Sequence, residues 1–176
     1  MKKLIALLVL AAAALAGCTR ADYTGVILAM GIDGENYTFA VSAAEGADII
    51  SAEGSTAEEA LEKAALASPR RPVYGNSVLI LVGEGGAAAL PEEELGATVA
   101  GVRGSAAETL EEDVLRLKRL FPAAAKENGI AETSLKYVQS SFAAGRGAEV
   151  PILADGAVKG MALLTRDGLI ISEDKP

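Results

Sequence analysis

The residue with the clearest chemistry is Cys18, the only cysteine in the chain. It stands directly behind the small pair Ala16-Gly17, which follows the apolar run Leu4–Leu15 and two N-terminal lysines. That run is shorter than the roughly 20 apolar residues that a membrane-spanning helix needs. The pattern is typical of bacterial lipoprotein signals, in which the mature cysteine carries diacylglycerol as a thioether. We therefore expect residues 1–17 to be a cleaved signal peptide, Cys18 to be the lipid attachment site and the protein to work outside the cytoplasm.

The alternative to this interpretation of Cys18 is an ordinary secretory signal with a cysteine that is buried by chance. If Cys18 is acylated, no thiol remains for disulfides, thiolate catalysis or a metal site, because it is the only cysteine. The chain also has no histidine. The lack of histidine removes the usual serine-hydrolase triad and most zinc sites. We expect no enzyme activity, no metal and no cofactor beyond the lipid on Cys18.

A glycine pattern is the one motif that could indicate a bound cofactor. Gly83-x-Gly85-x-x-Ala88 follows an apolar run and precedes a stretch that we expect to be helical, which is the setting of a dinucleotide-binding turn. Backbone amides at such a helix start could hold a phosphate. An extracytoplasmic lipoprotein has no supply of nicotinamide cofactor, so we interpret the pattern as a plain strand-to-helix turn.

Carboxylates are the other candidates for chemistry, because paired carboxylates can act as acid and base. They gather at expected helix starts, where they satisfy free amides and favour the helix dipole. We interpret them as solvated first turns. The clusters are Glu58, Glu59 and Glu62; Glu92, Glu93 and Glu94; and Glu108, Glu111, Glu112 and Asp113.

Charge and composition narrow the class of protein. The chain has 176 residues, a formal net charge of −8 and 51% hydrophobic residues, with 4% aromatics and no tryptophan. An acidic chain is a poor partner for nucleic acid, since phosphates need Lys and Arg. It is also a poor partner for anionic headgroups, so the acyl chains would hold it at the membrane. We expect a single domain over residues 18–171, with a flexible tail over 172–176.

Two hairpins are expected near the ends of the domain. The first joins strands Tyr23–Met30 and Tyr37–Ser42 around Asp33-Gly34, a good hairpin turn. The second joins Gly156–Thr165 to Leu169–Ile171 around Asp167-Gly168. Between Gly46 and Gly54 the pattern indicates a loop that contains a weak strand.

Helix signals lie between these hairpins. Two overlapping capping boxes, Ser55 with Glu58 and Thr56 with Glu59, begin a helix that ends at Pro69. A capping box of Ser105 with Glu108 begins a second helix, which ends at Pro122. Its apolar stripe consists of Leu110, Val114, Leu117 and Phe121.

The remaining elements complete the expected fold. A weaker helix is expected over Glu132–Phe142, a central strand over Ser77–Val82 and a short helical stretch from Ala87 to Leu90. These elements predict an α+β (mixed α/β) domain, in which antiparallel hairpins and the central strand pack against several helices.

Blocks along the chain also follow an order that is found in a known family. Asp22 follows Cys18 closely, and the strand Val26–Met30 leads into the turn Gly31-Ile32-Asp33. The later blocks are Tyr37-Thr38-Phe39, Gly54-Ser55-Thr56-x-x-Glu59-Ala60-Leu61, Tyr74–Glu84, Val150-Pro151, Val158–Leu164 and Asp167-Gly168-Leu169. Together they resemble the N-terminal domain of the C-subunit lipoproteins of bacterial spore germinant receptors (the Ger(x)C type), from Cys18 nearly to the end of the chain.

The resemblance implies a non-enzymatic subunit, lipid-anchored on the outer face of the spore inner membrane. It would assemble with membrane-embedded A- and B-type subunits to transduce nutrient germinants. Cys18, as the lipid attachment site, is the only functional residue that the resemblance implies for this chain. The chain departs from the family at Thr19-Arg20, where the family has Trp-Asp, and at Asn76 and Ser77, where it has His and Lys. It also covers only what would be the first of three domains.

The alternative is an unrelated extracytoplasmic lipoprotein that captures a small ligand. Such a protein would need a pocket with convergent polar groups. The chain has no aromatic-rich stretch that would line such a pocket.

Overall fold

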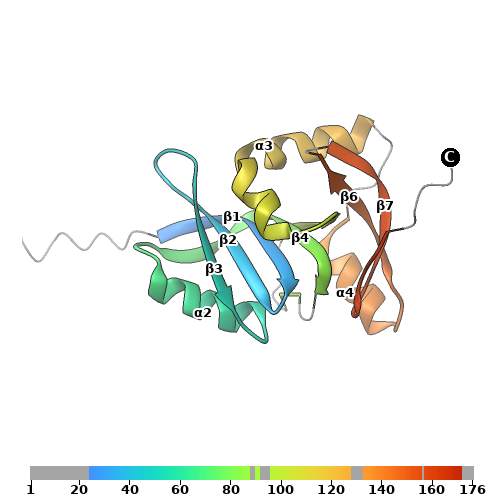
Figure 1. Cartoon of the computed structure of the whole chain (residues 1–176), viewed down its shortest axis with the longest axis horizontal. Coiled ribbons are helices and arrows are strands. Elements are labelled where there is room, and N and C mark those ends of the chain that lie inside the picture. Colours follow the sequence, from blue (N-terminus) through green and yellow to red (C-terminus); the bar gives the residue numbers. More distant parts are fainter. Residues whose placement is uncertain (1–23, 88–89, 92–95, 128–132, 156, 172–176) are drawn as a thin grey trace, which may run out of the picture.

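The computed structural model describes residues 24–87, 90–91, 96–127, 133–155 and 157–171. These residues form an eight-stranded mixed sheet with the strand order β3-β2-β1-β4-β5-β6-β7-β8. The central strands β1, β4, β5 and β6 are mutually parallel, whereas the strands toward both edges are antiparallel. Figure 1 shows helix α3 on one side of this sheet and helices α2 and α4 on the other. The expectation of an α+β fold is confirmed, although strand dominates.

The first hairpin forms as predicted and runs further than expected. Strand β1 (Thr24–Gly34) pairs antiparallel with β2 (Asn36–Ser42). Gly34 has a positive φ of 67°, which suits the first central position of a two-residue turn. The weak strand predicted within the loop Gly46–Gly54 is a full strand, β3 (Ala47–Glu53), and all seven of its residues pair with β2.

Helix α2 (Ala57–Ala67) begins and ends close to its predicted limits. Thr56 is the N-cap, and its hydroxyl accepts a hydrogen bond from the Glu59 amide at 3.2 Å. The Glu59 carboxylate reaches back to the amide of Ser55 at 2.9 Å. The buried face of α2 consists of alanines, so the helix lies close to the sheet; they are Ala57, Ala60 and Ala64.

The predicted central strand is part of a much longer one. Strand β4 (Arg71–Ala87) runs beside β1 and continues through Gly83–Gly86. The prediction of a helical stretch beginning at Ala87 is wrong, because Ala87 pairs with Gly34 of β1. Strand β5 (Ala97–Val102), which the sequence pattern did not reveal, lies parallel to β4.

Two helices connect β5 to the last part of the sheet. Helix α3 (Ala106–Glu127) continues through Pro122, where we expected it to end. Pro122 directly follows Phe121, the last residue of the buried stripe, and its fixed φ is compatible with a helix although one backbone hydrogen bond is lost. Helix α4 (Leu135–Ala143) begins at the N-cap Ser134, within the predicted range.

The second hairpin is also confirmed. Strand β7 (Ala157–Thr165) pairs antiparallel with the short β8 (Gly168–Ile170). Strand β6 (Ala148–Ala154) precedes β7 as a further antiparallel partner and lies parallel to β5. The sheet curls at this end, since a Cβ on Gly86 of β4 would lie 2.7 Å from the Gly168 Cα.

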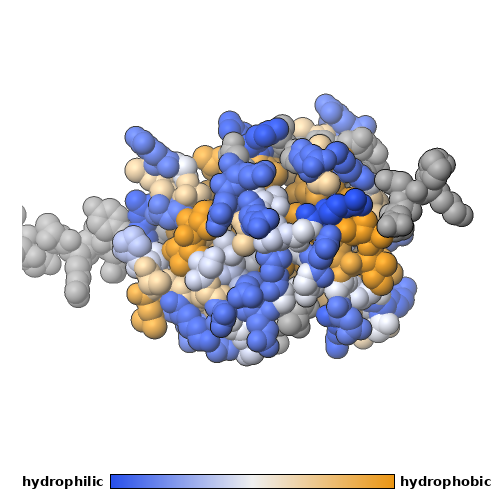
Figure 2. All heavy atoms as spheres, in the orientation of Figure 1, coloured by the Kyte–Doolittle hydropathy of each residue, from blue (hydrophilic) through white to orange (hydrophobic). Residues whose placement is uncertain are grey.

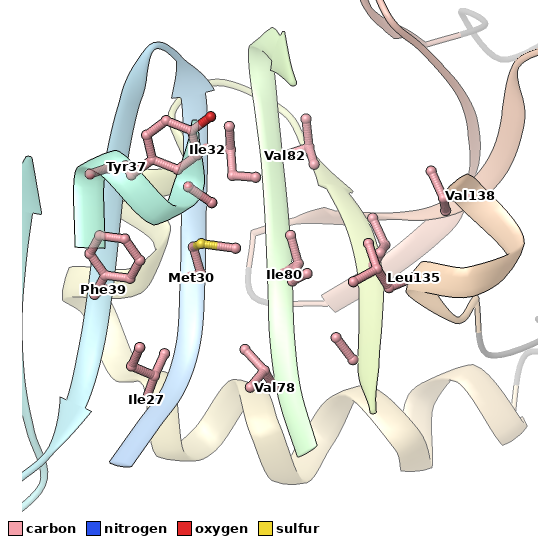
Figure 3. Close-up of a cluster of buried hydrophobic side chains, with 14 of the residues drawn as sticks. Ile27, Met30, Ile32, Tyr37, Phe39, Val78, Ile80, Val82, Leu135 and Val138 are labelled. Atoms are coloured by element: carbon pink, nitrogen blue, oxygen red, sulfur yellow. The ribbon is translucent and has the colours of Figure 1, made fainter. Parts of the chain in front are cut away.

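Buried side chains fill both faces of the sheet. The face under α2 and α4 holds the larger residues, and Figure 3 shows ten of them projecting from β1, β2, β4 and α4: Ile27, Met30, Ile32, Tyr37, Phe39, Val78, Ile80, Val82, Leu135 and Val138. Burying each such side chain contributes roughly 1.5–3 kcal/mol. The opposite face packs against the predicted stripe of α3, and all four residues of that stripe are buried. Among the described helices, none is both long and apolar enough to cross a membrane.

Candidate functional site

Cys18, the predicted lipid attachment site, lies outside the described residues, as do the predicted signal peptide and the predicted tail. Lipidation of Cys18 therefore stays a prediction from the sequence. The described residues that bear on function fall into three places. These are the start of helix α3, a cavity near the ends of β5 and β6, and an exposed apolar surface on β7 and β8.

The start of helix α3 is held by Asp33, which belongs to the turn Gly31-Ile32-Asp33. Its Oδ1 accepts a hydrogen bond from the Ala106 amide at 3.0 Å. Its Oδ2 accepts from the Ala107 amide at 3.1 Å and from the Ser105 hydroxyl at 2.9 Å. A carboxylate at this position also favours the positive end of the helix dipole. Asp33 thus caps a helix that begins more than 70 residues later in the chain.

A second segment, Gly83-Glu84, completes this junction. A Cβ on Gly83 would lie 1.9 Å from the Asp33 Oδ1, so only glycine leaves room for the carboxylate. The Glu84 amide donates to the Gly104 carbonyl at 3.1 Å, and the Gly104 amide donates to the Glu84 Oε1 at 3.2 Å. Two segments that are far apart in sequence therefore fix where α3 begins.

This geometry corrects the interpretation of the glycine pattern at residues 83–88. Gly83 and Gly85 lie within strand β4 and not in a strand-to-helix turn, while Ala88 lies outside the described residues. The helix start beside Gly83 belongs to α3, and the Asp33 carboxylate already binds its first amides. A phosphate would have to displace that carboxylate.

The prediction that the carboxylate clusters lie in first helical turns holds for Glu58 and Glu59 in α2 and for Glu108 in α3. Glu62, Glu111, Glu112 and Asp113 lie further along these helices. Glu59 lies in the cap of α2 and also pairs with Lys63 at 2.8 Å. The hydrogen bonds from Lys63 and Ser55 lower the pKa of Glu59 to about 2. Glu108 donates its amide to the Ser105 hydroxyl at 3.4 Å, so the second capping box is formed in part. Glu92, Glu93 and Glu94 lie outside the described residues. Within the described ranges no group of acidic residues is arranged to hold a metal ion.

A cavity of about 680 Å³ opens near the carboxyl ends of β5 and β6. Its polar lining is Arg103, which directly follows β5, together with Asp155 and Lys159 of the β6–β7 hairpin. The other lining residues are apolar or small: Ile152, Ala154, Gly160, Met161 and Ile171. The volume lies within the range of small-molecule sites, roughly 300–1,000 Å³.

The described lining of this cavity carries two cationic side chains, Arg103 and Lys159, and one carboxylate, Asp155. Lys159 donates a hydrogen bond to the Asp155 carboxylate, which holds the pKa of Asp155 below its ordinary value, and the nearby Arg103 lowers it further. The Arg103 amide is fixed by a bond of 3.2 Å to the Leu153 carbonyl. Its guanidinium has no hydrogen bond or ion pair to any other described residue. Because Lys159 and Asp155 neutralise each other, Arg103 leaves the described lining with one net positive charge.

An exposed apolar surface lies on the last two strands. We use the term β7–β8 surface for Met161, Leu163 and Ile170, which are 36%, 40% and 56% exposed. Leu163 and Ile170 are directly paired between the two strands, so their side chains share one face. Hydrophobic side chains gather over this end of the molecule in Figure 2.

The structure brings together some residues that the sequence treated separately. Ser105 was expected only to cap its own helix, yet it also donates to Asp33. Asp33 was expected only in a hairpin turn, and nothing in its local pattern indicated a cap for α3. Arg103 carried no signal at all, because strand β5, which positions it, was not predicted.

The chain was compared with protein-family models, with curated proteins and with solved structures, and none of the three comparisons gave a match.

Proposed function

We propose that this chain is a lipid-anchored, non-enzymatic subunit of a spore nutrient germinant receptor. It would be tethered through Cys18 on the outer face of the spore inner membrane. There it would act by protein–protein contacts with membrane-embedded A- and B-type subunits. The proposal starts from the resemblance of the sequence blocks. Two features of the described residues support it, the junction at the start of α3 and the β7–β8 surface.

The observation that carries the proposal is the junction at the start of α3. Gly31-Ile32-Asp33 and Gly83-Glu84 are two separate blocks of the resemblance, and they meet at this junction through direct hydrogen bonds and a close approach. Residues that a fold needs in combination are expected to persist together in related proteins. The resemblance therefore rests in part on residues that cooperate in space, which chance similarity would not favour.

The β7–β8 surface supports a role in protein contacts. Apolar side chains that share an exposed face are typical of interaction sites. Met161 and Leu163 also lie within the block Val158–Leu164 of the resemblance. A receptor partner that covers these residues would remove apolar area from water and shield the short edge strand β8.

The test is a crosslinking pull-down of the tagged protein from dormant-spore membranes, read by mass spectrometry. We expect recovery of polytopic germinant-receptor subunits. A double variant, Leu163→Lys with Ile170→Lys, should lose this recovery. Leu66→Lys is the matched control, because Leu66 is 90% exposed on α2, away from the β7–β8 surface.

Absence of receptor subunits, with the bait present and lipidated, would overturn the proposal. The resemblance to the germinant-receptor subunits would then be limited to the fold, and the alternative of a ligand-capturing lipoprotein would be favoured. Equal recovery with the double variant would instead reject the β7–β8 surface as the contact.

A further inference from the structure

We propose that the cavity beside Arg103 binds a small organic monocarboxylate with a short aliphatic body. The site combines the Arg103 guanidinium, which has no partner among the described residues, with a few aliphatic side chains in a lining that is more polar than apolar, and no family resemblance assigns it a role. The inference does not rest on the germinant-receptor proposal, because it follows from the lining of the cavity.

Arg103 defines the polar end of the site. A guanidinium presents a rigid fork of donors that matches a carboxylate bidentately, and such charge-assisted pairs are among the strongest hydrogen bonds. The backbone of Arg103 is held at the sheet end by its bond to Leu153, which fixes the point from which its exposed side chain extends. The Lys159 ammonium is already bound to Asp155, which leaves Arg103 as the available cation.

The charge balance favours an anion with a single charge. One carboxylate brings the net charge of the Arg103, Asp155 and Lys159 lining to zero. Glu108 and Glu112 line an adjoining hollow that Arg103 and Asp155 also border, so further negative charge on the ligand would meet repulsion. A phosphate ester, which carries close to two negative charges at neutral pH, is therefore disfavoured.

The apolar part of the lining selects the body of the ligand. Met161 and Ile171 offer flexible and branched aliphatic surface, whereas Ile152 is 4% exposed and contributes little, and no aromatic ring lines the described cavity. Aliphatic carbons placed against them gain about 0.8 kcal/mol for each buried methylene. A branched body of about five carbons suits these side chains, because each methylene that it buries gains energy of that order.

The test is a calorimetric titration of the full chain, purified in detergent micelles, with sodium 4-methylpentanoate as the probe. We expect saturable binding at a single site. Arg103→Gln should weaken the binding at least about tenfold, since it removes a charge-assisted bidentate pair. Arg146→Gln is the matched control, because Arg146 is exposed and does not line this cavity.

A second probe and a second variant examine the two ends of the site separately. Replacement of the carboxylate by an amine, in 4-methylpentylamine, should abolish binding. Met161→Gln should weaken the carboxylate probe while the thermal midpoint stays within a few degrees of the parent. Absence of saturable binding, equal affinity of Arg103→Gln, or equal binding of the amine would each overturn the proposal.

Discussion

The Asp33 carboxylate accepts a hydrogen bond of 2.9 Å from the Ser105 hydroxyl, across 72 residues of sequence. The same carboxylate also accepts from the Ala106 and Ala107 amides. Thus the hairpin that opens the domain caps the longest described helix. The registry between the sheet and α3 depends on this contact, because Gly31 and Ala106 pack directly against each other beside it.

Loss of the cap should destabilise the whole domain. Asp33→Ala removes three hydrogen-bond acceptor contacts and the charge at the helix start. We expect the free energy of unfolding to fall by about 2 kcal/mol, measured by urea denaturation. Glu35→Ala is the control, because Glu35 is an exposed carboxylate in the same turn. Equal losses in the two variants would contradict the capping role.

The Asp33 cap also requires a glycine at position 83. In Gly83→Ala the new methyl group would collide with the Asp33 carboxylate and lie 2.8 Å from the Gly104 carbonyl. We expect a loss of about 1–3 kcal/mol in unfolding free energy from this overpacking. Gly85→Ala is the matched control two residues away, where the nearest atoms lie at 3.4 Å. If Gly85→Ala destabilised the protein as much, the strand and not the junction would be responsible.

The apolar stripe of α3 should tolerate no charge. Leu117→Asp would place a carboxylate against the sheet, where Leu117 is 6% exposed. We expect loss of about 3 kcal/mol or more and a clear drop in thermal midpoint. Leu115→Asp on the same helix should have little effect, because Leu115 is 39% exposed. Unchanged melting of Leu117→Asp would contradict the packing of α3.

The α2 cap should contribute a small, pH-dependent part of the stability. The folded pKa of Glu59 is about 2, below its ordinary 4.5, so its contribution is present above pH 4.5 and is lost as the pH falls toward 2. Glu59→Gln should therefore differ from the parent at neutral pH and converge with it in acid. Urea midpoints measured across this range provide the test. Solvent around this exposed pair keeps the effect small, and Glu58→Gln is the neighbouring control.

Anchoring should depend on the single thiol. Cys18→Ala removes the atom that would carry the lipid, so we expect the variant protein to partition into the aqueous fraction. Spores that carry only this variant should lose the contribution of the protein to germination. Membrane fractionation and a germination assay provide the measurements. Normal germination with a fully released protein would count against the anchor.

Local patterns predicted those elements whose signals lie within a few residues. The turn at Asp33-Gly34, the capping box of Thr56 with Glu59 and the stripe of α3 all formed, because backbone geometry and adjacent side chains determine them. Strand β3 was predicted only as a weak strand within a loop, and strand β5 was not predicted. Each is recruited by a neighbouring strand, β2 or β4, and pairing between strands leaves no strong mark on the recruited sequence. Pro122 misled the prediction of the α3 end, because the fixed φ of proline is compatible with a helix and a single proline need not end one.

The sequence by itself predicted a lipoprotein signal, and it determined the lack of histidine chemistry, the two hairpins and the amphipathic helix α3. All of these depend on composition or on residues close together in the chain. Only the tertiary structure decided that Asp33 caps α3, that Gly83 makes room for it and that Arg103 faces a cavity with Asp155 and Lys159. The physical reason is that these groups meet through the order of strands in the sheet, which is set by the burial of both its faces and not by any local signal.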